Sequence, residues 1–417
     1  MNFSMNVKMR DAAAIAPVRF GFPPSFARAH EVRKRNTIKE NQMRSILICT
    51  ALLLSSFTTA RAESGVTDKT IVIGQSAAFS GPNAQLGNDM NLGARIYFQQ
   101  VNERGGVFGR KIELRTKDDG YEPDRAKQNT IEFIQKDEVF ALFGYVGTPT
   151  SNAANPVFTE AKVPFIGAFS GANSLREPFN RNIFNVRASY YDETERIVDQ
   201  LVTTGVKNIA VFYQNDAYGK AGLEGVTRAM TKRNLKVAAL STVERNSTEV
   251  AAAVKTLAAA NPQAIVQISA YSSCAALIKE MKKSSYTGQF VNVSFVGSRA
   301  LSDALGKEGA GVMITQVMPF PWSEVSPLQR EYLSSMKKSG VPEMSFGSVE
   351  GFVAAKVFVE GLRRAGRDLT REKLVAALES MRDFDLGGYT VSFTPTNHNG
   401  SRFVEITMIG GNGRFVK

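Results

Sequence analysis

The sequence predicts an α/β protein made of two doubly wound domains, each a parallel sheet covered by helices. Short β-branched runs that read as buried strands alternate with stretches of helical apolar periodicity. This alternation occurs once before about residue 190 and again after it. Strands that alternate with helices favour parallel pairing, because each crossover helix returns the chain to the same edge of the sheet.

The first run of alternating segments supplies one domain. Strands are expected at residues 70–74, 111–115, 139–144 and 163–167. Helices are expected around residues 92–101, at 124–135 with Asp124 as the cap, and at 155–161. A loop rich in Gly, Ser and Asn follows the first strand, but it lacks the glycine spacing of a nucleotide-binding motif.

The second run supplies the other domain. Its helices are expected at residues 192–204, 219–233, 248–260 and 274–283, and its strands at 208–213, 236–240, 264–268 and 289–293. Late helices are expected at residues 328–338, 348–365 and 371–381, before a β-rich tail at 389–393 and 403–409. Once a leader of 62 residues is set aside, roughly 355 residues remain, which suits two domains of ordinary size.

An apolar segment near the start predicts a secretory signal peptide. Met43 and Arg44 precede an apolar stretch at residues 46–54, and the segment ends in Ala60-Arg61-Ala62. The stretch is shorter than the roughly 20 residues that cross a bilayer. We therefore expect cleavage near Ala62 and a mature protein in the periplasm.

Residues 1–42 are basic and irregular, and two interpretations are open. Either the start codon is misassigned and translation begins at Met43, or a cytoplasmic tail precedes a signal anchor. The shortness of the apolar segment favours the first interpretation.

Charge and composition exclude several classes of function. The net charge is +12, but residues 1–62 carry ten Lys or Arg against three Asp or Glu, and the remaining surplus forms no basic block. We therefore expect no nucleic-acid partner. The only cysteines are Cys49 and Cys274, and the only histidines are His30 and His398. This predicts no internal disulfide, no metal site, no cofactor and no His-based nucleophile in the mature chain.

In open parallel sheets, ligands bind beyond the carboxyl ends of the strands. The turn after the third expected strand contains Tyr145 and Thr148, and the turn after the fourth contains Phe169, Ser170 and Gly171. Glycines and hydroxyls in a turn that opens a helix suit a small carboxylate. No strand end pairs an acid with a base or a nucleophile with a histidine, so we expect no enzymatic activity.

The second domain offers tyrosines in equivalent places. Tyr218 follows one expected strand and Tyr271 follows another. Each is either an ordinary packed residue near a turn or a side chain that closes over a ligand from the opposite domain.

Several motifs in their order and spacing resemble the type I periplasmic binding proteins, in particular the leucine/isoleucine/valine-binding branch. They occupy residues 73–87, 101–112, 117–123, 215–219 and 350–356, within a resemblance that covers about residues 68–410. The resemblance implies two Rossmann-like lobes, joined by a hinge of three crossovers, that close on a ligand. It places lobe 1 at residues 63–188 and 318–388 and lobe 2 at 189–317 and 389–417. It also implies an ABC permease as partner, and we expect a monomer.

The resemblance also implies roles for particular residues. The carboxylate site falls at Thr148, with a second contact near Phe169, Ser170 and Gly171. The tyrosines of the far lobe fall at Tyr218 and Tyr271. In some members an aromatic residue of the first loop lines the ligand site. Leu86 occupies the corresponding position here and has a smaller side chain.

One position departs from the family pattern. The acidic residue that pairs with a ligand ammonium falls near Ser294, and no acid lies between Gln289 and Leu301. Burying an ammonium without an anion is costly. The sequence therefore favours a carboxylate with an apolar or aromatic body, contacted by Thr148, Tyr145 and the other aromatic residues. Two alternatives remain: a branched-chain amino acid binding protein proper, and a ligand-sensing receptor that is not coupled to transport.

Overall fold

The computed structural model describes residue 19, residues 63–341 and residues 343–417. The predicted leader, signal segment and cleavage near Ala62 lie outside the described residues and stay predictions. Among the helices that are described, none is long and apolar enough to span a bilayer.

The first sheet has five parallel strands in the order β2-β1-β3-β4-β5. Its strands are β1 (Thr70–Ala77), β2 (Lys111–Asp118), β3 (Ala141–Phe143), β4 (Phe165–Ile166) and β5 (Ile183–Phe184). The helices between them are α2 (Ala84–Glu103), α3 (Pro123–Gln135) and α4 (Thr148–Glu160). The strand order reverses at β1, which lies between β2 and β3, so the loops after β1 and β3 diverge and leave room for a ligand.

The second sheet has seven strands in the order β14-β13-β10-β9-β8-β6-β7. Five are parallel: β6 (Ile209–Gln214), β7 (Leu240–Val243), β8 (Ala264–Ile268), β9 (Gln289–Asn292) and β10 (Met313–Gln316). β13 (Glu405–Ile409) and β14 (Phe415–Val416) extend it antiparallel. Its helices are α5 (Tyr190–Thr203), α6 (Ala217–Thr231), α7 (Ala251–Ala260), α8 (Tyr271–Lys283) and α9 (Ser298–Leu305).

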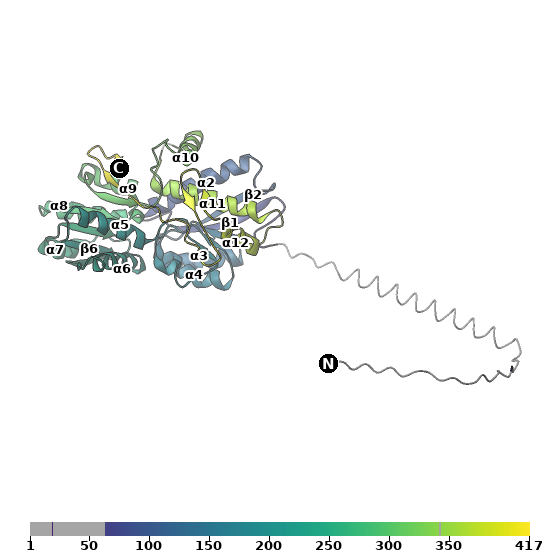
Figure 1. The fold of residues 1–417 in the computed structure, drawn as a ribbon, viewed down its shortest axis with the longest axis horizontal. Helices are drawn as coiled ribbons and strands as arrows, with labels where there is room; N and C mark the ends of the chain where they lie inside the picture. The colour runs from purple at the N-terminus through teal and green to yellow at the C-terminus, as the bar shows by residue number, and fades with distance from the viewer. Residues whose placement is uncertain (1–18, 20–62, 342) are drawn as a thin grey trace, which may run out of the picture. The chain divides into compact units, whose positions relative to one another are not determined.

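The segment between β10 and β13 returns to the first sheet. It contains α10 (Pro327–Lys338), α11 (Phe346–Ala365), α12 (Arg371–Glu379) and a small pair, β11 (Phe384–Asp385) with β12 (Thr390–Val391). α11 packs along α2, and Figure 1 shows the two helices side by side. Gly93 and Gly351 allow this approach, because a Cβ at either would lie within 2.1 Å of a backbone oxygen of the opposite helix. The chain thus passes three times between the two halves.

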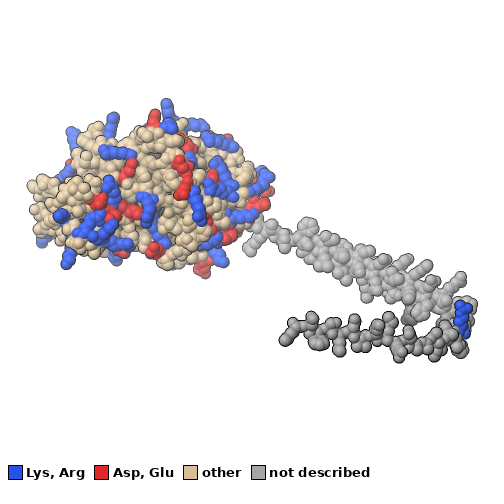
Figure 2. Space-filling view, in the orientation of Figure 1, with Lys and Arg blue, Asp and Glu red and all other residues tan. Residues whose placement is uncertain are grey.

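Basic and acidic side chains are interspersed on the face shown in Figure 2. Among all described residues, many charged side chains form ion pairs, such as Arg181 with Glu372 and Glu379. On the visible face the positive charge therefore forms no separate patch.

The predicted α/β class with doubly wound parallel sheets is confirmed, and the sequence missed parts of the detail. The strand expected at 236–240 runs instead from Leu240 to Val243, at the edge of the second sheet. Asp124 does not cap α3, because the helix begins at Pro123 after Glu122. α9, β5, β10 and β14 were not expected. The lobe boundaries after residues 188, 317 and 388 stay a prediction.

Candidate functional site

Two turns at the carboxyl edge of the first sheet lie side by side. The turn after β3 leads to Thr148, the first residue of α4, and the turn after β4 contains Phe169 and Ser170. Gly147 N donates to Phe169 O at 3.2 Å, and Phe169 N donates to Tyr145 O at 2.8 Å. These bonds bring the N-terminus of α4, with its free backbone amides, against the end of the neighbouring strand.

Thr148 and Ser170 form a buried hydroxyl pair at this place. Their Oγ atoms are 2.8 Å apart, and both side chains are fully buried. Ser170 Oγ also accepts a hydrogen bond from Ala172 N at 3.2 Å. Hydroxyls beside a helix N-terminus suit an anion, because the helix dipole and the free amides both favour negative charge.

Glycines in these two turns make room for two tyrosine rings. Gly147 has a φ of 103°, and a Cβ there would lie 2.3 Å from the ring of Tyr121. A Cβ on Gly171 would lie 2.5 Å from the ring of Tyr190, whose backbone N donates to Gly171 O at 2.7 Å. A larger residue at either position would displace a tyrosine.

Five buried aromatic side chains meet next to the hydroxyl pair. This aromatic cluster consists of Tyr121, Phe169, Tyr190, Tyr218 and Phe295. Phe295 lies at its centre, with its ring centroid 5.9 Å from Tyr121, 5.4 Å from Phe169 and 4.6 Å from Tyr218. Tyr190 and Tyr218 are 5.3 Å apart. The five residues follow strands of both sheets, so the cluster spans the two halves of the molecule.

Other predicted site residues lie at the margin of this cluster or away from it. A Cβ on Gly297 would lie 2.5 Å from Leu86 and 3.5 Å from Tyr271, so Leu86 and Tyr271 meet near this glycine from α2 and α8. Tyr145 is buried in a separate part of the core, and its hydroxyl lies 2.9 Å from Thr130 Oγ1. The structure does not bring Tyr145 together with the aromatic cluster.

Ser294 lies against a buried ion group that sequence analysis missed, made of Arg187, Glu193 and Glu350. Arg187 donates to Glu193 at 3.0 Å, to Glu350 at 3.4 Å and also to the Ser294 hydroxyl. Ser294 N donates to Glu193 at 2.7 Å. The expectation of a site without an acid near Ser294 is therefore wrong, because α5 brings an acid there from 101 residues earlier in the chain.

The charges of this group are balanced within it. Glu193 accepts four hydrogen bonds, one from Arg187, two from Ser294 and one from Thr315 at 2.6 Å. Burial opposes the charge of Arg187, but Glu350 and Glu193 outweigh it and raise the pKa of Arg187. Burial raises the pKa of Glu350 to about 7, although Arg187 acts in the opposite direction. Glu350 is thus partly protonated near neutral pH.

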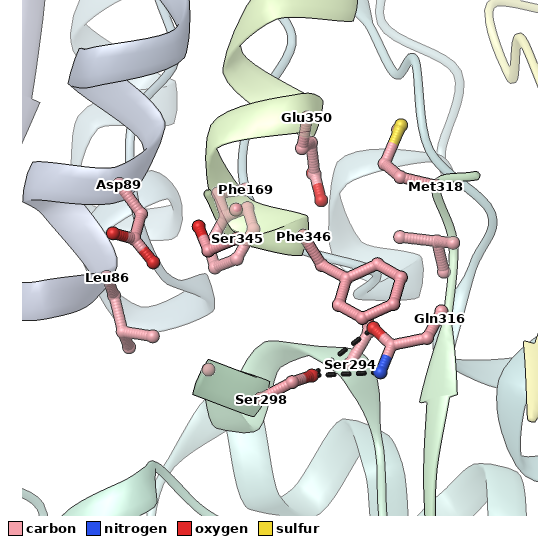
Figure 3. A pocket seen from close by; sticks show the side chains of 13 residues that line it. Leu86, Asp89, Phe169, Ser294, Ser298, Gln316, Met318, Ser345, Phe346 and Glu350 are labelled. Carbon is pink, nitrogen blue, oxygen red and sulfur yellow. Dashed lines mark hydrogen bonds between the residues drawn. The ribbon is translucent and has the colours of Figure 1, made fainter. Parts of the chain in front are cut away.

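A small cavity adjoins the ion group, between α2, α11, α9 and β10. Figure 3 shows Asp89 and Glu350 directed into it, opposite Gln316, whose Nε2 donates to Ser298 Oγ at 2.9 Å. The predicted residues Leu86, Phe169 and Ser294 also line it. Its volume is about 10 Å³, which is enough for about one water molecule. The cavity is therefore too small for a larger solute.

Polar contacts join the two halves at the rim. Asn246 Nδ2 donates to Gly120 O at 3.1 Å and to Glu122 at 2.8 Å, and Asn246 Oδ1 accepts from Asn83 Nδ2 at 2.8 Å. Arg245 pairs with Glu122 at 2.9 Å. These bonds connect the loops after β1 and β2 to the loop after β7, so they stabilise the closed arrangement.

The sequence offered only weak signals for the residues it missed. Glu350 lies inside one of the motifs that carried the family resemblance, without a role attached to it. Arg187 follows an apolar strand, where a charged residue is unusual. For Glu193 and Phe295 we find no local signal, since their positions depend on contacts between distant segments.

The family comparison agrees with this architecture. The model of the family described as "Periplasmic binding protein" matches residues 70–414. The chain belongs to this family. The resemblance read from the motifs is therefore confirmed, and members of the family bind substrates rather than transform them.

This periplasmic binding protein is similar in sequence to relatives over most of their length. It is 24% identical over 351 residues to "Leu/Ile/Val-binding protein homolog 7" of Brucella suis biovar 1 (strain 1330), covering 79% of this chain and 86% of that protein.

Two solved structures are more similar in sequence. A possible leucine/isoleucine/valine-binding protein from Rhodopirellula baltica SH 1 is 33% identical, with a TM-score of 0.79, and the match covers 84% of this chain and 97% of that one. A substrate-binding periplasmic protein from Ralstonia solanacearum is 34% identical, with a TM-score of 0.78 and coverage of 83% and 99%.

Proposed function

We propose that this protein is the periplasmic solute receptor of an ABC importer and that it holds a small organic carboxylate between its halves. The observation that carries the proposal is the buried pair of Thr148 and Ser170 at the N-terminus of α4. Its hydroxyls and helix amides have the chemistry that a carboxylate requires. The aromatic cluster beside the pair suits an apolar or aromatic body.

The ion group favours, as the first candidate, a solute that carries a carboxylate but no ammonium group. A carboxylate offers about four acceptor positions, and Glu193 already accepts four hydrogen bonds. Its charge is also matched by that of Arg187. Glu193 therefore has no acceptor position left for an ammonium group of the ligand.

A branched-chain or aromatic amino acid is the second candidate, and a different observation favours it. Asp89 and Glu350 both line the small cavity, and either carboxylate could pair with an ammonium. The names of the Brucella and Rhodopirellula relatives point to the same ligand class. Burial raises the pKa of both carboxyl groups, so a cationic ligand would have to ionise them as it binds.

Calorimetry with matched solutes separates the two candidates. We would titrate protein, refolded to remove bound solute, with 4-methylpentanoate against L-leucine and with 3-phenylpropanoate against L-phenylalanine. Within each pair the solutes differ only by the ammonium group. Tighter binding of the simple acids supports the first candidate, and tighter binding of the amino acids supports the second. Absence of binding for all four, with no solute released from the purified protein, would contradict the proposed function.

Coupling to transport follows from closure of the cleft. A receptor whose halves close on solute presents a permease with a two-state surface. We infer that the solute leaves unchanged and that a monomer performs this function. A sensory receptor would share the fold, so uptake of the identified solute in a strain lacking this protein distinguishes the two roles. Loss of uptake supports import, whereas unchanged uptake supports sensing.

A further inference from the structure

Two buried polar atoms next to the aromatic cluster make no hydrogen bond with any residue that the structure describes. They are Tyr190 Oη and Gln214 Oε1, and both side chains are fully buried. A buried polar atom without a partner costs free energy comparable to that of a lost hydrogen bond. Two such atoms at the carboxyl edges of the sheets indicate groups that a ligand completes.

Tyr190 presents a donor beside the hydroxyl pair. Its ring lies against Gly171 and is 5.3 Å from the ring of Tyr218. Burial raises the pKa of Tyr190 to about 12, while the Arg187 charge and a contact with the Thr148 side chain, too poor in geometry to count as a hydrogen bond, lower it. The hydroxyl therefore keeps its proton at neutral pH and lies next to Thr148, where the proposed function places a carboxylate.

Gln214 presents an acceptor on the side of the second sheet. Its Nε2 donates to Asp216 Oδ2 at 2.6 Å and lies 3.3 Å from the Tyr121 hydroxyl. Exchanging the amide oxygen and nitrogen would place two acceptors 2.6 Å apart, so the contact with Asp216 fixes the orientation of the amide. Oε1 is left as a neutral acceptor on a side chain whose Nε2 contacts Tyr121, a member of the aromatic cluster.

We propose that Tyr190 and Gln214 are ligand-anchoring residues, with Tyr190 donating to the carboxylate of the solute and Gln214 accepting from an O–H or N–H group of the same solute. The proposal rests on the proposed function and narrows it. The preferred solute is a carboxylic acid that also carries a hydrogen-bond donor. A simple fatty or aryl acid would leave the Gln214 acceptor without a partner.

Three head groups on one carbon skeleton test this preference. The probes are 4-methylpentanoate, 2-hydroxy-4-methylpentanoate and L-leucine, and a parallel set consists of 3-phenylpropanoate, 2-hydroxy-3-phenylpropanoate and L-phenylalanine. In at least one set, the wild-type protein should bind a donor-bearing probe about tenfold or more tightly than the simple acid. For every probe that the wild-type protein binds, Tyr190→Phe should lower the affinity about tenfold. Gln214→Met should abolish the preference for a donor.

Two tyrosines serve as controls. Tyr286 also has a buried hydroxyl without a partner among the described residues, but it lies near the amino end of β9, away from the cleft edge. Tyr286→Phe should leave all affinities unchanged. The Tyr332 hydroxyl lies 2.6 Å from Ser348 Oγ. In refolded, solute-free protein, Tyr332→Phe should lower the urea midpoint clearly, whereas Tyr190→Phe should lower it less, because its hydroxyl makes only a weak contact with Thr148.

The outcomes are distinguishable. If the wild-type protein binds none of the six probes and releases no solute, the proposed function fails and the anchors fail with it. If it binds a probe and Tyr190→Phe binds equally well, or if the simple acids bind best, only the anchoring proposal is overturned. A urea midpoint that falls in Tyr190→Phe as far as in Tyr332→Phe would also overturn it, since the hydroxyl would then be structural.

Discussion

Asn246 offers the sharpest test of how the cleft closes. Its side chain makes three hydrogen bonds, to Gly120, Glu122 and Asn83, and all three partners belong to the opposite half. The substitution Asn246→Gly removes them all. The backbone φ of Asn246 is 61°, which glycine adopts freely, so the substitution adds no strain.

The expected loss can be worked out from these bonds. Each contributes about 0.5–1.5 kcal/mol, so three contribute at most roughly 1.5–4.5 kcal/mol. Asn246 is only half-buried, and water replaces part of what is lost. We expect the closed state to lose about 1–3 kcal/mol, which weakens binding of the solute about 5- to 150-fold if closure and binding are coupled.

The assay is calorimetry with the solute that the purified protein releases, together with the radius of gyration from small-angle X-ray scattering. Asn246→Gly should bind more weakly and become more extended. Asn234→Gly is the matched control, because Asn234 also has a positive φ, of 57°, and is exposed after α6. A dissociation constant within twofold of wild type in Asn246→Gly, or an equal loss in Asn234→Gly, would refute the reasoning.

Three further predictions concern charge and packing. In the folded protein Glu350 keeps its proton up to about pH 7, whereas in the unfolded chain it ionises near its ordinary pKa of 4.5. Its contribution to the free energy of unfolding should therefore fall as the pH rises from 4.5 to 7, and urea denaturation of Glu350→Gln should not show this decrease. Arg187→Met should cost about 3–5 kcal/mol in urea denaturation because it leaves the buried Glu193 carboxylate, and the ionised fraction of Glu350, without a counter-charge. A loss below about 1 kcal/mol would contradict this. Trp322 is the only tryptophan, and its ring stacks on Phe415 with centroids 5.5 Å apart. Phe415→Ala should expose the indole ring to water and shift its fluorescence emission to the red. An unchanged emission spectrum would contradict this prediction.

The fold could be predicted from the sequence because its elements carry local signals. β1 is a β-branched run that is almost wholly buried, and α11 begins within two residues of the expected helix. The turns after β3 and β4 could be found because parallel strands bring their carboxyl ends to one edge. β5 was missed because it has only two residues, and β10 because it has only four and one of its partners, β13, lies far along the chain.

The sequence placed several candidate residues at the edges of both sheets, and their roles in binding stay predictions. Thr148 and Ser170 lie on adjacent turns of one sheet, where local chemistry and topology suffice. The ion group could not be predicted, since Arg187, Glu193 and Glu350 come from the chain crossing, α5 and α11 and meet only after the halves have packed. A charged side chain is stable in the buried interior only when oppositely charged or hydrogen-bonding groups lie beside it, and the spacing of residues in the sequence does not show which groups these are.

The return of the chain through β13 has a consequence for how the molecule can form. β13 pairs with β10 only after residues 317–404 have travelled through the other half and back. Neither half is a continuous stretch, so a single cut cannot yield two autonomous pieces. Contacts so distant along the chain slow folding, because the entropy of closing a long loop is lost before any pairing compensates for it. β13 and β14 can therefore join the second sheet only after the chain has passed through the other half, and a lesion in α11 should delay this last step.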